Sequence, residues 1–296
     1  MTPLADLLAP CGPVRDAKAA EHVFEHLKAA AEAEGWASLL ARARDAMAPV
    51  FGASSYLAAL ARRRPAVLGE ILGCNPAARL ADILARTERA GHAAGDAGRK
   101  ALRLLKAETH LLTALCDLGG VWDLDAVTGA ITRFADAACH AALRLAAADE
   151  IAAGRLIASK DDAHGPVPGY FCLAMGKQGA FELNYSSDID ISIFYDPEAL
   201  PLASNVEPQA FAERFTRAFA QGLQEKTSDS YVFRVDLRLR PDPSSTPPAV
   251  PVVAAFDYYE SVGQNWERAA FIKARPVAGD LPAARDFLNE LSPFIW

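Results

Sequence analysis

The sequence has 296 residues, of which 51% are hydrophobic and 23% charged, and its formal net charge is −7. A chain of this length can bury one large core or two ordinary ones, and its acidic balance argues against a protein that binds nucleic acid over a broad surface. No apolar run approaches the ~18 residues that would span a membrane, and the N-terminus lacks the basic and apolar segments of a signal peptide.

The five cysteines are scattered singly and form neither a CxxC pair nor a Cys/His cluster with zinc spacing. An odd, dispersed set of this kind is typical of reduced, buried thiols. The sequence therefore predicts a cytoplasmic protein with no membrane partner and no nucleic-acid partner.

The first predicted domain covers residues 1–155. From about residue 15 onward it is rich in Ala, Leu, Arg and Glu. In the stretch RKALRLLKAETHLLTALCDLGG, apolar residues recur at three- and four-residue steps, which indicates a helix that ends at Gly119 and Gly120. Asp123 or Asp125 is placed to cap the next helix. The pattern predicts a helical domain without chemistry of its own.

The composition changes at DDAHGPVPGY, whose prolines and glycines indicate a linker or loop. GYFCLAMG is typical of a buried strand, and the β-rich runs DIDISIFYD and YVFRVDLRLRP are separated by the helical QAFAERFTRAFAQGLQEK. We expect strands only after Pro166 and thus an α+β chain. A core with a small mixed sheet is predicted over residues 156–262, and the start of a following helical region over 263–296.

Two acidic residues, Asp188 and Asp190, lie two positions apart in the first β-rich run. Residues two apart in a strand share a face, so both carboxylates point one way while the intervening isoleucines point to the core. The two negative charges repel each other unless a cation lies between them. Oxygen ligands of this kind favour magnesium.

The second β-rich run repeats this logic with Asp236. The apolar residues Val235, Leu237 and Leu239 alternate with the polar residues Arg234, Asp236, Arg238 and Arg240. An acid flanked by arginines supplies a third metal ligand together with cations that bind phosphate oxygens bidentately.

The order of these features is more specific than any one of them. A lone DxD is common, and an alternating Arg/Asp strand is often only a solvated face. In this chain, a turn with Gly176 and Gly179 follows a strand, and a Ser-Ser pair, the DxD strand, a helix and the third Asp come after it. That order predicts a polymerase-β-like nucleotidyltransferase fold with a two-metal centre.

Three segments also resemble the motifs of one family. GKQGAFELNYSSDIDISIFYD resembles the G-K-L-G-x-x-E-L-N-[FY]-S-S-D-I-D-L-I-F signature of the bifunctional glutamine synthetase adenylyltransferase/adenylyl-removing enzymes. YVFRVDLRLRP resembles the second motif, R-V-D-x-R-L-R-P, and GQNWERAAFIKARPVAGD resembles a third, in which Trp-Glu-Arg precedes Lys-Ala-Arg. The helical stretch LRLLKAETHLLTALCDLGG is similar to the segment before the family's catalytic core, so the likeness covers roughly residues 97–280.

The family has two nucleotidyltransferase halves. The N-terminal half removes AMP from a tyrosine of glutamine synthetase by phosphorolysis, which releases ADP and reactivates the synthetase, and the C-terminal half attaches AMP from ATP. This chain resembles the removing half, because its core directly follows a helical segment that starts at Met1 and because WERAAFIKAR is similar to the removing version of the third motif. It departs from the family pattern at Gln178, in place of Leu, at Ala180-Phe181, in place of a Gly-rich pair, and after Pro241, where a Pro/Ser/Thr stretch replaces a Gly-containing loop.

The resemblance implies that Asp188, Asp190 and Asp236 are catalytic residues that hold two Mg²⁺ ions. It further implies that phosphate or nucleotide contacts the residues Gly176, Lys177, Ser186, Ser187, Arg238 and Arg240. For Lys177 and the two arginines, a place on the solvated surface is the competing interpretation.

The roles of six further residues, in the first and third motifs, are less specific. Glu182 and Asn184 either orient the signature or cap its turn. A helix in the third motif is expected to border a nucleotide (ATP or ADP) pocket with Glu267, Arg268 and Lys273, whereas packing is the preferred role of Trp266.

The implied partners are adenylylated glutamine synthetase, a PII-type signalling protein and phosphate or ADP. Carboxylates alone do not fix the direction of AMP transfer, so forward adenylylation of a protein tyrosine with ATP is an alternative. A non-catalytic regulatory module that keeps the fold is another, although three intact acids would be needless in it. The C-terminal segment DFLNELSPFIW is crowded with apolar residues, and we expect a truncated helical region with exposed apolar surface near Phe294 and Trp296.

Overall fold

The computed structural model describes residues 2–159 and 163–296, so Asp161 and Asp162 of the expected linker lie outside the described residues. The chain divides into two compact units, residues 1–86 with 104–134 (unit 1) and residues 87–103 with 135–296 (unit 2). The elements in chain order are η1 (Leu4–Asp6), α1 (Ala17–Ala33), α2 (Ala37–Ala53), α3 (Ser55–Arg63), α4 (Pro65–Gly73), α5 (Pro76–Ala90), α6 (Asp96–Leu118), α7 (Leu124–Ala152), β1 (Tyr170–Ala174), α8 (Gly176–Gly179), β2 (Ile189–Tyr195), α9 (Pro208–Gln224), β3 (Val235–Asp236), β4 (Val250–Pro251), α10 (Val252–Ser261), α11 (Asn265–Phe271), β5 (Arg275–Gly279), α12 (Leu281–Glu290) and α13 (Ser292–Ile295).

Unit 1 consists of helices, and local sequence signals set where they begin and end. The Asp16 side chain accepts a hydrogen bond from the Ala19 amide and caps α1. Helix α6 ends at Leu118, directly before the two glycines that the sequence marked as its end. Of the two candidate caps for α7, Asp123 has this role, because its carboxylate accepts a 2.9 Å hydrogen bond from the Ala126 amide.

Unit 2 contains a five-stranded mixed sheet. Four strands follow the order β3-β2-β1-β5, and β4 pairs with the far end of β2. Strand β1 is antiparallel to β2 and β5, while β2 is parallel to β3 and β4. Among the described residues, the strands begin only at Tyr170. The α+β fold class is therefore confirmed.

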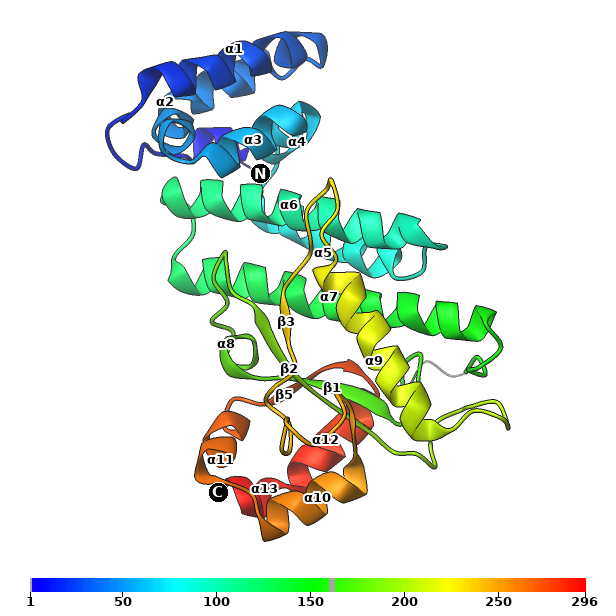
Figure 1. Cartoon of the computed structure of the whole chain (residues 1–296). Helices are drawn as coiled ribbons and strands as arrows, with labels where there is room; N and C mark the ends of the chain where they lie inside the picture. Colours follow the sequence, from blue (N-terminus) through cyan, green and yellow to red (C-terminus); the bar gives the residue numbers. More distant parts are fainter. Residues whose placement is uncertain (1, 160–162) are drawn as a thin grey trace. The chain divides into compact units, whose positions relative to one another are not determined.

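Both faces of the sheet are covered within unit 2. Figure 1 shows the orange and red helices α10–α13 gathered on one side of the strands, where Phe171, Phe194 and Phe287 form the centre of an apolar core. On the other face Tyr170 contacts α9, because its hydroxyl bonds Thr216 at 2.7 Å. Strand β2 is consequently buried along its whole length except at one position, Asp190.

Two expectations from the sequence are corrected. The second β-rich run was expected to alternate as a strand through Arg240, but β3 consists only of Val235 and Asp236. It ends there because the Asp236 carboxylate accepts a hydrogen bond from the Arg238 amide, which competes with the sheet ladder. Residues 263–296 are not only helical, since they include β5, which pairs with β1 in the same sheet as the acidic strands.

The apolar C-terminal segment is mostly buried rather than exposed. Phe287, Leu291 and Ile295 belong to the core between the sheet and α10–α13, and Phe294 is partly buried against it. Trp296, in contrast, exposes 82% of its surface. Apolar exposure in this segment is therefore concentrated at its last residue.

Replacement of Phe287 tests this core. Its ring stacks on Phe194 with centroids 4.5 Å apart and contacts Phe171 and Phe256, so Phe287→Ala should lower the free energy of unfolding of unit 2 by roughly 3–5 kcal/mol. Urea unfolding followed by circular dichroism measures this loss. The matched control Trp296→Ala should change it by about 0.5 kcal/mol or less, and equal effects of the two variants would contradict the assigned core.

Candidate active site

Three carboxylates lie together at the beginning of β2 and β3. The parallel register of these strands places Asp190 directly beside Asp236. Asp188 comes two residues before Asp190 and so lies on the same side of the extended chain. Asp188 is exposed and the other two are partly buried. The pairing of β2 with β3 therefore unites acids that are 46 residues apart in sequence.

Their electrostatic coupling is visible at Asp190. Burial raises the pKa of its carboxyl group, and the charges of Asp188 and Asp236 raise it further. The cations of Arg238 and Lys177 act in the opposite direction. Asp190 thus lies where negative charge accumulates and positive charge is favoured.

The guanidinium of Arg238 is the cation bound most directly to this cluster. Its Nε lies 3.0 and 2.9 Å from the two carboxylate oxygens of Asp236, and its backbone amide donates to the same side chain at 2.9 Å. These hydrogen bonds hold the pKa of Asp236 below its usual value against the effect of burial. Because the Arg238 side chain is 82% exposed, it can leave this carboxylate at little packing cost.

Gly176 forms the floor of the site. It begins α8 directly after β1 with a φ of +51°, and a Cβ atom at this position would lie 2.5 Å from the Asp190 Oδ2. Only glycine combines this left-handed conformation with so close an approach. The backbone of the α8 turn therefore lies directly against the central carboxylate, while the phosphate contact expected of Gly176 stays a prediction.

The loop between α8 and β2 is ordered by Asn184. Its side-chain oxygen accepts hydrogen bonds from the Ser186 amide at 3.2 Å and from the Ser187 hydroxyl at 2.9 Å. Arg234 bonds the Ser186 carbonyl oxygen at 2.7 Å. These contacts cap the turn at Ser186, and they hold both serines immediately before the acidic pair, so they separate neither of the two roles predicted for Asn184 from the other.

The remaining predicted cations differ in their contacts. Lys177 is exposed on α8, and its charge acts on Asp190. Arg240 instead donates to the carbonyl oxygens of Leu237, Pro243 and Thr246 at 2.6, 3.0 and 3.0 Å. Its guanidinium holds the Pro/Ser/Thr loop, so the geometry favours a structural role over phosphate binding.

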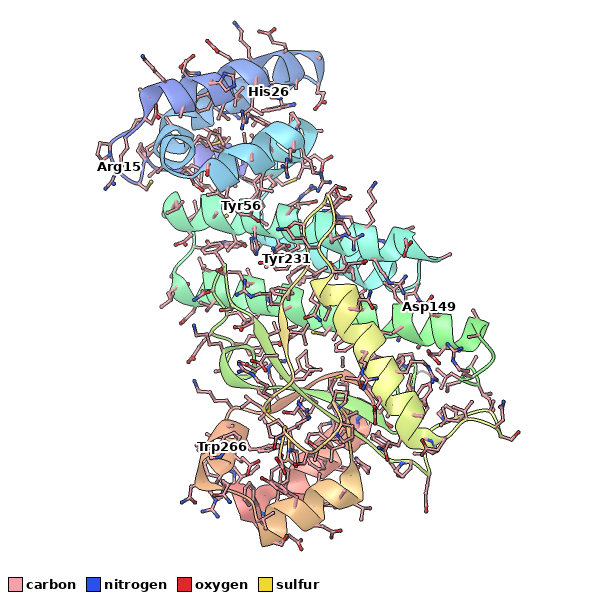
Figure 2. The ribbon with its side chains drawn as sticks, in the orientation of Figure 1. Arg15, His26, Tyr56, Asp149, Tyr231 and Trp266 are labelled. Carbon is pink, nitrogen blue, oxygen red and sulfur yellow. The ribbon has the colours of Figure 1, made fainter. Side chains whose placement is uncertain are left out.

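The third motif lies partly in the core and partly at the surface. Glu267 is 3% exposed, and its carboxylate accepts hydrogen bonds from the Gln264 amide and the Tyr258 hydroxyl. Arg268 lies 5.4 Å from the centroid of the Phe294 ring. Trp266, labelled on α11 in Figure 2, is 52% exposed rather than packed inside.

Lys273 forms an ion pair of 3.0 Å with Glu182, which ties the third motif to the segment after α8. Among the contacts of the described residues, Lys273 is thus the residue of the predicted pocket border that touches the first motif, at Glu182. Glu267 and Arg268 contact α10 and α13 instead. The network that connects α8 to Asp136 and Arg275 was not predicted, since nothing in the sequence around Asp136 indicates a partner 42 residues away.

The three carboxylates offer the oxygen ligands that a hard divalent cation prefers. The raised pKa of Asp190 reflects, besides burial, the negative charge around it, which such a cation compensates. In the described part of the chain, no three His, Cys, Asp or Glu side chains are positioned to hold one ion together. At this site the Asp236 carboxylate is paired with the Arg238 guanidinium. Residues and chemistry fit a metal, provided that Arg238 turns outward and frees that carboxylate.

Comparison with known proteins shows to which family the chain is similar. Residues 44–290 match the family model described as glutamate-ammonia ligase adenylyltransferase. A bifunctional glutamine synthetase adenylyltransferase/adenylyl-removing enzyme of Caulobacter vibrioides is 60% identical over the whole of this chain, which aligns with the N-terminal 30% of that protein. Proteins of the same name from Bradyrhizobium sp. and Rhodopseudomonas palustris are 50% and 49% identical over 89% and 85% of the chain, and 26% of each relative is covered. The chain thus spans less than a third of the length of these relatives.

No helix in the described residues is long and apolar enough to cross a membrane.

A glycine substitution tests the contact between α8 and Asp190. Gly176→Ala should cost roughly 1–2 kcal/mol of unfolding free energy for its left-handed backbone and a further loss for the clash with the carboxylate. Gly154→Ala is the matched control, since Gly154 has a φ of +68° but no atom within 4 Å of an added Cβ. Denaturant unfolding should show the larger loss for Gly176→Ala, and identical losses would refute the close approach.

Removal of the Arg238 cation tests the electrostatics. In Arg238→Gln the pKa of Asp236 should rise, because its hydrogen bonds to the guanidinium are the main cause of the depression. A carboxyl group whose pKa is lower in the folded than in the unfolded state stabilises the fold above its ordinary pKa. This stabilisation is lost as the pH falls through the pKa of the folded state. The variant should therefore lose less stability on acidification than the parent chain. Carboxyl ¹³C titration by NMR measures the shift, and an unchanged Asp236 pKa would be the contrary result.

Proposed function

This chain belongs to the glutamate–ammonia ligase adenylyltransferase family, and we propose that it removes AMP from adenylylated glutamine synthetase by phosphorolysis. The observation that carries the proposal is the juxtaposition of Asp190 with Asp236 across β2 and β3, with Asp188 beside them. A crowded set of carboxylates over a glycine turn suits phosphoryl-type transfer, in which catalysis is mostly positioning and charge stabilisation.

The proposed reaction is a displacement at the phosphorus of adenylyl-tyrosine. A phosphate oxygen forms a bond to this phosphorus while the bond to the tyrosine oxygen breaks. The products are ADP and the free tyrosine, whose phenolate takes up a proton. Phenol has a pKa of about 10, so the phenolate is a manageable leaving group when a cation stabilises it.

Asp188, Asp190 and Asp236 are proposed to hold two magnesium ions. When bound, these ions neutralise the phosphodiester and the departing phenolate. The protein's own part is to keep three acids ionised and close together, which the burial of Asp190 and its neighbours' charges oppose. Acids that repel one another in the free protein are suited to bind cations tightly.

Other groups in the site are assigned to the anionic reactants. The exposed Lys177 and the exposed Arg238, once it leaves Asp236, are proposed to contact phosphate or the nucleotide phosphates. Ser186 and Ser187 are held in place by Asn184 next to the acidic pair and are assigned to phosphate contact, as is the backbone at Gly176. Arg240 is assigned to the loop that it already holds.

The removing direction is favoured by the third motif, WERAAFIKAR, and by the alignment with the N-terminal part of the Caulobacter relative. Forward transfer of AMP from ATP to the synthetase is the second candidate, because one arrangement of carboxylates serves both directions. A regulatory module that binds a PII-type signalling protein without turnover is the third. These functions differ in their products, so one assay separates them.

The purified chain should convert ³²P-labelled phosphate and adenylylated glutamine synthetase into labelled ADP in the presence of Mg²⁺. Asp190→Asn should reduce this rate by at least ~10³-fold, since one charge of the central ligand is lost, while the circular dichroism spectrum stays unchanged. Asp196→Asn, at the exposed residue that directly follows β2, is the matched control and should retain parental activity.

Three outcomes would count against the proposal. Release of pyrophosphate from ATP and unmodified synthetase, without ADP formation from phosphate, would assign the forward direction. Near-parental activity of Asp190→Asn would remove the carboxylates from the mechanism. Absence of turnover in both directions, together with binding of the signalling protein, would establish the regulatory module.

A further inference from the structure

A polar cluster outside the carboxylate site connects α7, α8 and β5. The side-chain amide of Gln178 donates to Asp136 at 2.9 Å. The guanidinium Nη2 of Arg275 lies 2.8 Å from each carboxylate oxygen of Asp136 and also donates to the Gln178 carbonyl oxygen at 3.1 Å. The three residues form a closed triangle, which we call the Asp136 clamp.

The clamp lies where charge is costly. Gln178 is fully buried, and the side chains of Asp136 and Arg275 expose only 21% and 23% of their surface. Burial raises the pKa of Asp136, while the hydrogen bonds and charge of its two partners lower it. A buried ion pair is expensive to break on one side, because the remaining charge is left without compensation.

A second set of contacts ties the same segments together. Phe181, just after α8, has a left-handed backbone with a φ of +60°, which is unfavourable for an aromatic residue. The Arg275 guanidinium lies 4.2 Å from the centroid of its ring, a cation–π geometry. Lys273 and Glu182 form an ion pair beside it. Residues 178–182 are thus held against the start of β5 at three points.

The held segment is the one that forms the floor of the carboxylate site. Gly176 is two residues before Gln178 in the same helical turn, and its α-carbon faces the Asp190 carboxylate at a distance that admits no side chain. Lys177, whose charge acts on Asp190, lies between them. A shift of the α8 turn would therefore change the surroundings of Asp190 directly.

We propose that Asp136 and Arg275 are positioning residues for AMP transfer, which act through Gln178 to fix the α8 turn against Asp190. The proposal rests on the proposed function for its catalytic consequence. Neither residue touches the reacting atoms. Their effect is to keep Gly176 and Lys177 at the place that phosphate and metal binding require.

The test replaces Asp136 in the 296-residue chain by asparagine, which preserves shape and removes the charge. Asp136→Asn should raise the hydrogen-exchange rates of backbone amides in residues 176–182 by at least ~10-fold and lower kcat by at least ~10-fold, with KM changed less than ~3-fold. Asp149→Asn is the matched control, because Asp149 lies on the same helix, α7, and pairs with Arg99 away from the α8 turn (Figure 2). This control should leave all three quantities unchanged.

A reciprocal exchange separates positioning from general stability. Gln178→Glu alone places two carboxylates against each other and should be more damaging than Asp136→Asn. In the double variant Asp136→Asn/Gln178→Glu, the asparagine amide donates to the new carboxylate and Arg275 keeps a negative partner. The double variant should recover most of the exchange protection and of kcat. A merely additive loss would overturn the proposal.

The experiment separates a failure of this proposal from a failure of the proposed function. If the parent chain has no activity, Mn²⁺ affinity measured by electron paramagnetic resonance replaces kcat and should fall at least ~3-fold in Asp136→Asn and recover in the double variant. Loss of protection without any change in kcat or Mn²⁺ affinity would overturn the positioning role, as would behaviour of Asp136→Asn identical to Asp149→Asn. If Asp136→Asn does not fold, Arg275→Lys, which keeps the charge but loses the planar fork, is measured in the same way with the same criteria.

Discussion

The parallel pairing of β2 with β3 forces two carboxylates into contact range, and much of the site is arranged around the resulting repulsion. Asp190 and Asp236 are register partners, and a third acid, Asp188, adds its charge to the pair. Separation of these side chains would require the strands to slip, and a slip by one residue would turn the core isoleucines toward solvent. The fold therefore keeps the charges together, and cations are the available compensation.

Burial of the sheet on both faces makes this constraint rigid. Helices α10–α13 cover one face and α9 covers the other, so β2 has no solvated face. Asp190 is the position of the strand that this burial leaves open. Polar contacts at the edges of the two strands complete the site: Asn184 holds the loop before β2, and Arg238 holds Asp236.

Much of this could be predicted from the sequence, and what could not be predicted depends on contacts distant along the chain. Period-two alternation identified β2 and its acids, and helical periodicity with capping residues identified α6 and α7. The length of β3 could not be predicted, because Asp236 folds back on Arg238 locally and an alternating pattern does not reveal this. Strand β5 was not recognised, since its pairing partner β1 lies about 100 residues earlier. Arg240 was assigned to phosphate, and its loop carbonyl partners become visible only in three dimensions.

The fold gives a physical reason for Gln178, at which the chain departs from the family motif. A fully buried amide in place of the leucine of the resembling motif costs desolvation unless it finds partners. Its nitrogen has one in Asp136, while its side-chain oxygen has no hydrogen-bond partner among the described residues. The opposite orientation of the amide would place that oxygen against a carboxylate, so the observed orientation is the one that the charge of Asp136 selects. A buried group that is only half satisfied adds little to stability. Its place beside Gly176 is better explained by the orientation that it gives to the α8 turn, where a small displacement reaches the central carboxylate directly.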